Sequence, residues 1–365
     1  MRFDFFPSRT LTVYLAKTFV VRILAVLLML VLVLQTLDLL GESGKVLGYP
    51  GNGEAELWHY VSLRFPQLVA RFLPYSVLLA TILTLATLNQ NSEVIAMKAA
   101  GMSAHQVLAP LLLAAFVVSG VSFTFNERIV TRSSATLKAW QDVDYGAVPK
   151  DSGVRANVYL ADGPNILTAV TVTGRGETTV MENVTFYIRD PRGMINEQIR
   201  SPRATYASPG WLLESPTRFD VQTAATAKLA PLVVAKGLTP IKVAISRVDA
   251  DAENAIELKR SIDLLNSAGR RTDELRGKWW HKFAGPLSAT LMPLLGAVAA
   301  FGLARSGQLF LRAVIGMALG FAYFVVDNAA LAMGNFGGYP PLLAAWAPFF
   351  LFLLVGETVL IRTEE

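Results

Sequence analysis

A short segment between two apolar runs combines an acid, a base and apolar residues. It reads Ser92-Glu93-Val94-Ile95-Ala96-Met97-Lys98-Ala99-Ala100-Gly101. Ser92 is suited to cap a short helix, Glu93 favours the positive end of the helix dipole, and Gly101 is suited to end the helix. The predicted helix exposes Val94 and Met97 beside one acid and one base. Such a surface is typical of a segment that docks on another protein, and the alternative is an ordinary connector.

Two carboxylates, Asp38 and Asp327, lie at the ends of apolar runs. Ionisable residues within membrane spans are costly, so each suggests a function. Either carboxylate could transfer protons, or it could pair with a basic neighbour such as Lys45 or Lys282. The centres of the apolar runs are almost purely aliphatic. This pattern favours ion pairs over a proton relay.

Other kinds of site are excluded or disfavoured by what the chain lacks. It has no cysteine, no G-x-x-x-x-G-K-[ST] phosphate loop, and three histidines without metal-ligand spacing. We therefore predict that this chain is not an enzyme and holds no metal and no cofactor. Any ATP-driven work would need a partner. The net charge of +5 is a mild excess that does not indicate a nucleic-acid partner.

Six apolar runs must position these residues. The chain has a mean hydropathy of +0.42, but a polar stretch over residues 126–278 separates two apolar regions. A membrane span needs roughly 20 mostly apolar residues. The predicted spans are residues 19–40, 72–92, 101–126, 283–304, 313–326 and 342–361.

The orientation of the spans follows from the basic residues in the short loops. One side carries Arg2, Arg9, Lys17, Lys98, Arg305, Arg312 and Arg362. The other side carries Lys45, Arg64 and Arg71. We therefore predict that both termini are cytoplasmic and that the polar stretch is periplasmic.

The polar stretch has the pattern of an all-β domain. Short runs of β-branched and aromatic residues alternate with turn sequences such as Asp162-Gly163-Pro164. The spacing suits a sandwich, a jelly roll or a barrel, and the segment contains no histidine. Residues predicted by alternation to face inward, where they could form an apolar slot, are Val158, Leu160, Ile166, Phe186 and Ile188.

The predicted fold is therefore a membrane α-helical bundle of six transmembrane helices with an inserted all-β, jellyroll-like periplasmic domain. The N-terminal half covers residues 1–126, with the short helix at 92–101. The β domain covers 140–250, a connecting helix 251–278 and the C-terminal half 279–365.

Three passages resemble one family. They are residues 88–103, containing a Ser-Glu-x-x-x-Met-[Arg/Lys]-Ala-x-Gly pattern, then Trp280-His281-Lys282-Phe283-Ala284-Gly285-Pro286-Leu287, and Tyr323-Phe324-Val325-Val326-Asp327. The chain resembles the LptF/LptG lipopolysaccharide-export permeases over nearly its whole length, and the first passage is most similar to that of LptG members. Those members place paired lysines soon after the acid that ends span one, whereas here the nearest base after Asp38 is Lys45.

The resemblance implies an ABC exporter of lipopolysaccharide in the bacterial inner membrane. Its other components would be an LptF-type permease, an LptB-type ATPase dimer, an LptC-type bitopic protein and an LptA-type periplasmic bridge. The residues that couple the chain to the ATPase would be Ser92, Glu93, Val94, Met97, Lys98 and Gly101. The first and fifth spans would line the lipid gates, with gate or cavity residues Leu28, Leu32, Gln35, Asp38, Lys45, Lys282, Phe324 and Asp327.

Two other interpretations remain open. The chain could be a membrane-anchored sensor or assembly factor whose β domain binds a partner. A secondary transporter is disfavoured by the aliphatic centres of the spans. Co-purification with an ATPase distinguishes an exporter subunit from an anchor.

Overall fold

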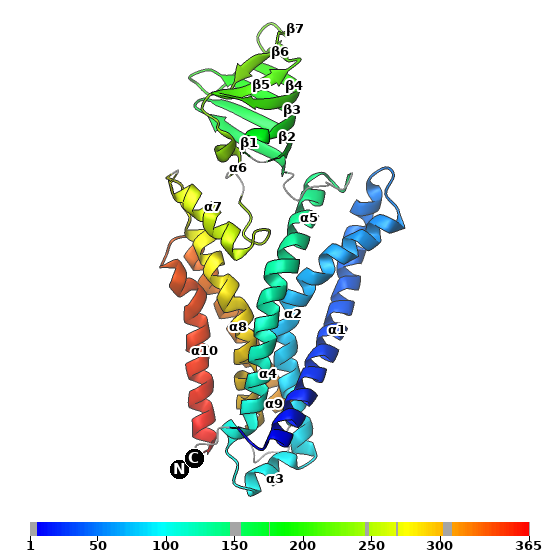
Figure 1. Cartoon of the computed structure of the whole chain (residues 1–365), viewed down its shortest axis with the longest axis vertical. Coiled ribbons are helices and arrows are strands. Elements are labelled where there is room, and N and C mark those ends of the chain that lie inside the picture. The colour runs from blue at the N-terminus through cyan, green and yellow to red at the C-terminus, as the bar shows by residue number, and fades with distance from the viewer. Residues whose placement is uncertain are drawn as a thin grey trace. The chain divides into compact units, whose positions relative to one another are not determined.

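The computed structural model describes residues 6–146, 155–174, 176–244, 248–267, 269–301 and 309–364 (Figure 1). The chain divides into two compact units. The first unit comprises Met1–Gly41, Arg64–Thr131 and Asn254–Glu365, and the second comprises Glu42–Leu63 and Arg132–Glu253. Long helices dominate the first unit, and the β domain belongs to the second.

Long helices run through most of the chain outside the β domain. They are α1 (Arg9–Gly48), α2 (Glu54–Gln90), α4 (Ala104–Phe125), α5 (Thr131–Asp142), α8 (Asp273–Phe301), α9 (Leu309–Asn335) and α10 (Pro341–Glu364). Shorter helices are α3 (Glu93–Ala99), the π-helical turn η1 (Asn126–Val130), α6 (Pro240–Ala244) and α7 (Ala255–Ser267).

Five helical segments among the described residues are long and apolar enough to cross a membrane. They are Arg9–Gly48, Glu54–Gln90, Ala104–Asp142, Val314–Asn335 and Pro341–Arg362. The fourth predicted span, 283–304, falls in α8 and continues into residues 302–304, which lie outside the described residues, as does Arg305. The helices extend beyond several predicted spans, because their polar ends keep the helical hydrogen bonds after the apolar run stops.

Small residues let the long helices approach each other closely. A Cβ added to Gly356 of α10 would lie 2.7 Å from the side chain of Leu294 in α8, and one added to Gly320 of α9 would overlap Leu78 of α2. The Ser119 hydroxyl of α4 donates to the Pro286 carbonyl of α8 at 2.8 Å. Close contacts of small residues and hydrogen bonds between helices are how apolar helices associate where lipid removes the hydrophobic driving force.

The β domain is an antiparallel sheet in which the first five strands pair in sequence. Its strands are β1 (Arg155–Asp162), β2 (Asn165–Thr173), β3 (Val180–Arg189), β4 (Ile195–Ala207), β5 (Gly210–Glu214), β6 (Thr217–Asp220), β7 (Thr226–Lys228) and β8 (Leu232–Val234). The order is β1-β2-β3-β4-β5-β8, with β6 pairing with β4 and β7. The chain therefore returns to the sheet after β5, where β6 pairs with β4 and β8 pairs with β5. We refer to this unit as the β domain.

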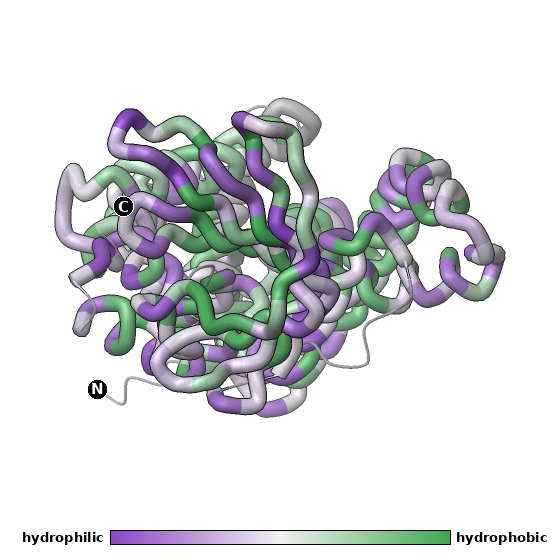
Figure 2. The backbone as a smooth tube through the Cα atoms, turned by 90° about the horizontal axis from the view of Figure 1, so that it is seen from above, coloured by the Kyte–Doolittle hydropathy of each residue, from purple (hydrophilic) through white to green (hydrophobic). Residues whose placement is uncertain are grey.

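Hydrophobic and hydrophilic residues both occur along the strands (Figure 2), and the buried ones form rows across the sheet. One row is Leu160, Leu167, Phe186 and Ile199, joined pair by pair through the register. All four are buried in one core. Ile166 pairs with Tyr187, one position away from this row, so it lies on the opposite face. The prediction that Ile166 faces inward was wrong, because the inward positions of β2 begin one residue later.

The segment after the β domain contains two helices where the sequence predicted one over residues 251–278. The first, α7, buries Leu258, Ile262 and Leu265, which recur at helical spacing. Gly269 follows it with a φ of +69°, a left-handed conformation that favours glycine at a helix end. The second, α8, then starts at Asp273, and residue 268 lies outside the described residues.

Candidate functional site

The short helix α3 is the best-defined candidate for a docking element. Its C-terminal end forms a Schellman motif, in which Gly101 N–H donates to the Lys98 carbonyl at 2.9 Å and Met102 N–H donates to the Met97 carbonyl at 3.1 Å. Gly101 has a φ of +86°, as this motif requires. The predicted cap by Ser92 was wrong: Ser92 has a φ of +61° and its side chain makes no capping hydrogen bond.

The exposed face of α3 differs from the predicted one. Val94 and Met97 are buried in the core of the helical unit, so the prediction that they are exposed was wrong. Their i, i+3 spacing places both on the same inward face. Ile95 is 62% exposed instead, and Lys98 lies on the exposed side as well. Ile95 was not among the residues predicted from the sequence. Because it directly follows Val94, it points to a different face of the helix, and this could have indicated its exposure.

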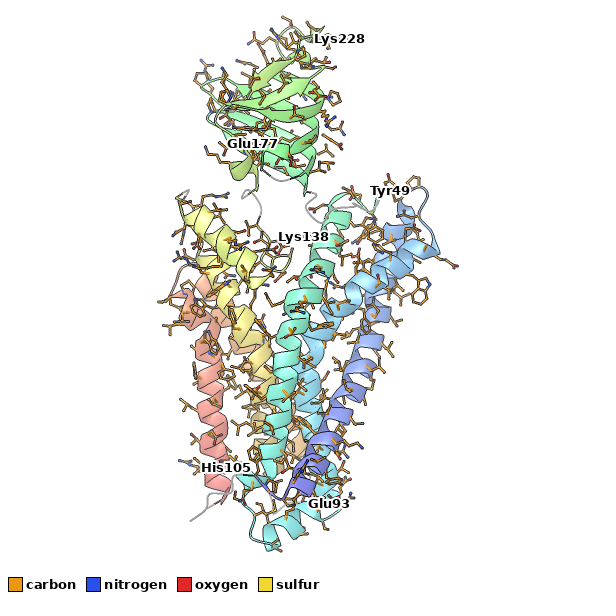
Figure 3. The ribbon with its side chains drawn as sticks, in the orientation of Figure 1. Tyr49, Glu93, His105, Lys138, Glu177 and Lys228 are labelled. Atoms are coloured by element: carbon orange, nitrogen blue, oxygen red, sulfur yellow. The ribbon has the colours of Figure 1, made fainter. Side chains whose placement is uncertain are left out.

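Glu93 connects α3 to the first long helix. The Tyr14 hydroxyl of α1 donates to the Glu93 carboxylate, at 3.2 Å to Oε2 and 3.4 Å to Oε1. The Asn91 side-chain amide donates to Oε1 at 3.3 Å. Figure 3 labels Glu93 beside the N-terminal end of α1. A residue predicted from sequence only to face a partner therefore also binds within its own chain.

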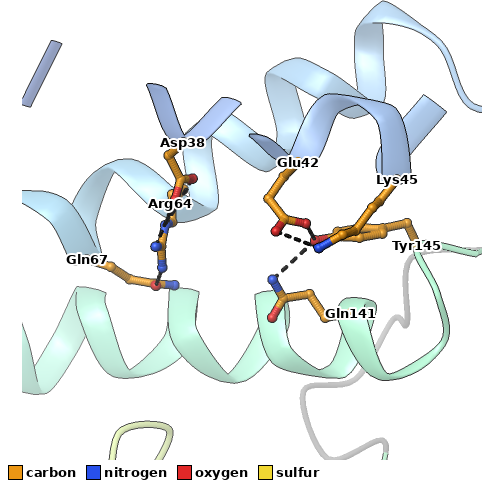
Figure 4. A network of polar contacts seen from close by, with 7 residues as sticks. All are labelled: Asp38, Glu42, Lys45, Arg64, Gln67, Gln141 and Tyr145. Atoms are coloured by element: carbon orange, nitrogen blue, oxygen red, sulfur yellow. Dashed lines mark hydrogen bonds and ion pairs between the residues drawn. The ribbon is translucent and has the colours of Figure 1, made fainter. Parts of the chain in front are cut away.

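Asp38 forms an ion pair with Arg64 of α2. The guanidinium donates from Nη2 at 2.9 Å and from Nε at 3.1 Å, and its Nη1 donates to Gln67 at 2.8 Å (Figure 4). The prediction of Lys45 as the partner of Asp38 was wrong. Lys45 instead pairs with Glu42 at 2.8 Å. Asp38 and Arg64 are equally far along the chain from Gly51, at the turn between α1 and α2, so the antiparallel helices place them side by side.

Asp327 of α9 pairs with His281 of α8, whose Nε2 lies 3.0 Å from Oδ2. The prediction that Lys282 pairs with Asp327 was wrong. Asp327 is buried, and its Oδ1 has no hydrogen-bond partner among the described residues. Neighbouring positions of α8 point in directions about 100° apart, so His281 and Lys282 meet different helices.

Lys282 contacts Glu127 in the π-helical turn η1, at 3.6 Å, and both side chains are largely buried. The other oxygen of Glu127 accepts from the Ala255 N–H at the start of α7, at 2.6 Å. The Trp279 indole donates to the Ala255 carbonyl at 2.8 Å. Glu127, which the sequence reasoning missed, thus joins η1, α7 and α8. A π-turn often marks a functional position in a helix.

The remaining gate candidates occupy different environments. Leu28 and Leu32 of α1 are 54% and 55% exposed, whereas Gln35 is buried. Neither amide atom of Gln35 hydrogen-bonds to a residue that the structure describes. Phe324 is buried and its ring stacks on Tyr75 of α2, with centroids 3.9 Å apart. The three candidates on α1 therefore divide into two exposed leucines and a buried amide.

An apolar cavity of about 540 Å³ lies between α1, α2 and α4. Leu24, Leu27, Leu73, Val117 and Val121 are among the residues that line it, and Ser122 contributes the polar exception. Leu24, Val117 and Val121 are also exposed, so the cavity opens on the outer face of these helices. Its lining suits a hydrocarbon chain.

The β-domain candidates, apart from Ile166, belong to one face. Val158, Leu160 and Phe186 are buried, and Ile188 packs against the same core. Outside the apolar core, the Thr223 N–H bond to Asp220 lowers the pKa of that carboxyl, helped by Gln222 N–H and Arg218. This arrangement holds the turn after β6.

No group of three or more His, Asp or Glu side chains suited to a metal occurs in the part of the chain that the structure describes. His105 pairs with Glu357 at 3.2 Å, and His59 packs edge-on against Trp140. The described side chains therefore present ion pairs and apolar surfaces, and the candidate site is one of docking and lipid contact.

Comparison with known proteins agrees with this chemistry. The profile of a family described as lipopolysaccharide export system permease LptF/LptG matches residues 13–362. The chain is 25% identical to the lipopolysaccharide export system permease protein LptG of Escherichia coli (strain K12), over 98% of this chain and 99% of that protein. It is 22% identical to LptG of Haemophilus influenzae (strain ATCC 51907 / DSM 11121 / KW20 / Rd), with the same coverage. With a match over nearly its whole length, the chain belongs to the LptF/LptG family of lipopolysaccharide export system permeases.

Proposed function

We propose that this chain is the LptG-type half of an ABC exporter that extracts lipopolysaccharide from the inner membrane and passes it to a periplasmic bridge. The family and the apolar helices make it a multi-pass inner-membrane permease subunit. In this proposal an LptF-type permease forms the other half and an LptB-type ATPase dimer supplies the energy. An LptC-type protein and an LptA-type bridge complete the path.

The observation that carries the proposal is the exposed docking surface of α3. A chain without a phosphate-binding loop needs a separate ATPase to use ATP. Helix α3 offers the exposed Ile95 between Glu93 and Lys98, and it is held rigidly by a Schellman motif and by the buried Val94 and Met97. A preformed helix with an apolar centre and charged flanks fits a groove on another protein.

The exposed faces of two helices support the proposed gates. Only 28% of the apolar window of the α1 span is buried within the chain, and the same share holds for Val314–Asn335 of α9. The corresponding share is 50% for the α2 and Ala104–Asp142 spans. Among the five described spans, these two therefore have the smallest buried share. Lipid chains or the partner permease would cover them, in line with the gate roles implied for the first and fifth spans.

Sidedness follows in the proposal from the basic loops and from the docking role of α3. An ATPase is cytoplasmic, so α3 and both termini face the cytoplasm. The β domain is then periplasmic, and the face with Val158, Leu160 and Phe186 would shield acyl chains from water. A charge at Ile188, which is only partly buried against this core, should block lipid transfer while ATP hydrolysis continues.

The decisive experiment is purification of the complex in detergent, with identification of the proteins and lipid that elute with the chain. Co-elution of an ATPase and of lipopolysaccharide supports an exporter subunit. A chain that elutes alone, or with a periplasmic partner only, would instead indicate the sensor or assembly factor. The docking surface is tested by Glu93→Lys, which reverses the charge beside Ile95. We expect loss of ATPase co-elution, and unchanged co-elution for the control Glu274→Lys in the exposed pair with Lys278.

A further inference from the structure

Helix α1 and the docking helix α3 share a direct polar contact. The Tyr14 hydroxyl lies 3.2 Å and 3.4 Å from the two Glu93 carboxylate oxygens, and Asn91 contacts the same carboxylate. Tyr14 is 45% exposed, so burial does not determine the position of its ring. A hydrogen bond to a charged acceptor contributes more than a neutral one. The contact therefore restrains α1 relative to the start of α3.

Helix α1 can transmit a displacement from this contact over a long distance. The helix runs without interruption from Arg9 to Gly48, and no proline lies within it. At about 1.5 Å per residue, Tyr14 and Asp38 are about 36 Å apart along one helix. Asp38 binds Arg64 of α2 near the far end. A displacement of α1 at Tyr14 is therefore carried along the helix past the candidate gate residues Leu28 and Leu32 to Asp38.

Apolar contacts also hold α3. Val94 and Met97 anchor the helix in the core of the unit, and α3 packs mainly against α4. Apolar packing of this kind holds α3 in place but is not specific for one direction of movement. The Tyr14 hydrogen bond is directional, and it ends on the acid beside the exposed docking residue Ile95.

We propose that Tyr14 is the positioning residue that transmits movement of the docking helix α3 to the gate helix α1 through Glu93. This inference rests on the proposed function. When the ATPase closes on ATP and moves α3, the Tyr14–Glu93 bond moves the cytoplasmic end of α1 with it. Without this hydrogen bond, the ATPase still docks on α3 and still hydrolyses ATP, but hydrolysis no longer drives lipid movement.

The test measures lipopolysaccharide released per ATP hydrolysed by the intact complex in liposomes. Tyr14→Phe removes only the hydroxyl, and we expect it to lower this ratio about fivefold, the effect of losing one net hydrogen bond, with assembly and ATP hydrolysis within about twofold of wild type. Tyr14→Lys discards the ring but can donate to Glu93, and we expect it to restore the ratio to within about twofold of wild type.

The control is Tyr49→Phe, just beyond the other end of α1, where the tyrosine is similarly exposed and its hydroxyl hydrogen-bonds to no described residue. It should leave the ratio unchanged. A wild-type ratio in Tyr14→Phe, or a Tyr14→Lys ratio as low as that of Tyr14→Phe, would overturn the inference, and so would loss of assembly in Tyr14→Phe. If the wild-type chain neither binds an ATPase nor releases lipid, the proposed function fails and the inference with it.

Discussion

At the scale of single residues, carboxylates near the ends of the long helices have partners on neighbouring helices. Asp38 binds Arg64, Asp327 binds His281 and Glu127 contacts Lys282. Each pair joins two elements of the bundle. Leaving one partner of a buried pair alone is strongly destabilising, because the remaining charge keeps its desolvation cost. The pairs therefore fix which helices lie together.

We predict that Arg64→Ala weakens the packing of α1 on α2 by about 2 kcal/mol, because it removes several hydrogen bonds to a partly buried carboxylate. Thermal unfolding in detergent should show a lower midpoint. Lys45→Ala removes an exposed pair with Glu42 and should change the stability by less than about 1 kcal/mol. Equal effects of the two substitutions would contradict the assigned partners.

At the scale of elements, one side chain joins three of them. Glu127 accepts from the N-terminal N–H of α7 while it contacts Lys282 of α8, and it sits in the turn η1 that continues α4. The adjoining rings of Phe123 and Phe283 stack with centroids 5.4 Å apart. The chain enters the β domain after η1 and leaves it before α7. Glu127 thus joins the two segments between which the β domain is inserted.

We predict that Glu127→Ala destabilises the docking of α7 by on the order of 3 kcal/mol, since it leaves the buried Lys282 without this carboxylate. Hydrogen exchange should accelerate in the first turns of α7. Asp263→Ala on the same helix removes only an exposed pair with Lys259 and serves as the control. Unchanged exchange in Glu127→Ala would show that apolar packing alone holds α7.

The register of β2 gives a second prediction at this scale. Leu167 is fully buried, whereas Ile166 points to the other face of the sheet. Leu167→Lys places an unpaired charge in the core and should open the β domain to limited proteolysis of the full chain. Ile166→Lys should be cleaved at nearly the wild-type rate. Similar sensitivity of both variants would argue for a different register.

At the scale of the whole molecule, uncovered apolar helices indicate an incomplete assembly. Most of the apolar surface of α1 and of Val314–Asn335 in α9 is not covered by this chain. The apolar cavity between α1, α2 and α4 opens beside the same helix α1. In a membrane these surfaces meet lipid or another protein. Contacts with lipid and with another subunit are both expected for a member of this family of export permeases.

We predict that photo-crosslinkers at Leu28 and Leu32 of α1 capture lipopolysaccharide or a helix of a partner subunit, because both side chains are exposed. Crosslinked species are identified by mass and by antibody against the lipid. Leu354 of α10 is equally exposed to the membrane and serves as the control. Equal capture at Leu354 would show only general lipid contact, which would argue against a gate at α1.

Composition and periodicity determined the general organisation of this protein. Apolar runs and alternating β-type segments predicted membrane helices with an inserted β domain, because lipid requires an unbroken apolar run whereas a sheet with one buried face requires alternation. The segment from Ser92 to Gly101 predicted a short helix ending at Gly101, because a left-handed helix end favours glycine. The resemblance in the same segment led to the family.

Tertiary structure alone decided which residues meet. The sequence could not show that Asp38 binds Arg64, because neighbours across two antiparallel helices depend on the turn between them. It could not show which face of α3 is buried, since an apolar residue serves equally well as a core contact or as a docking surface. The prediction for β2 was likewise out by one residue: Leu167, and not Ile166, faces the β core. Local pattern sets the type of each element, and contacts between distant segments set the roles of its side chains.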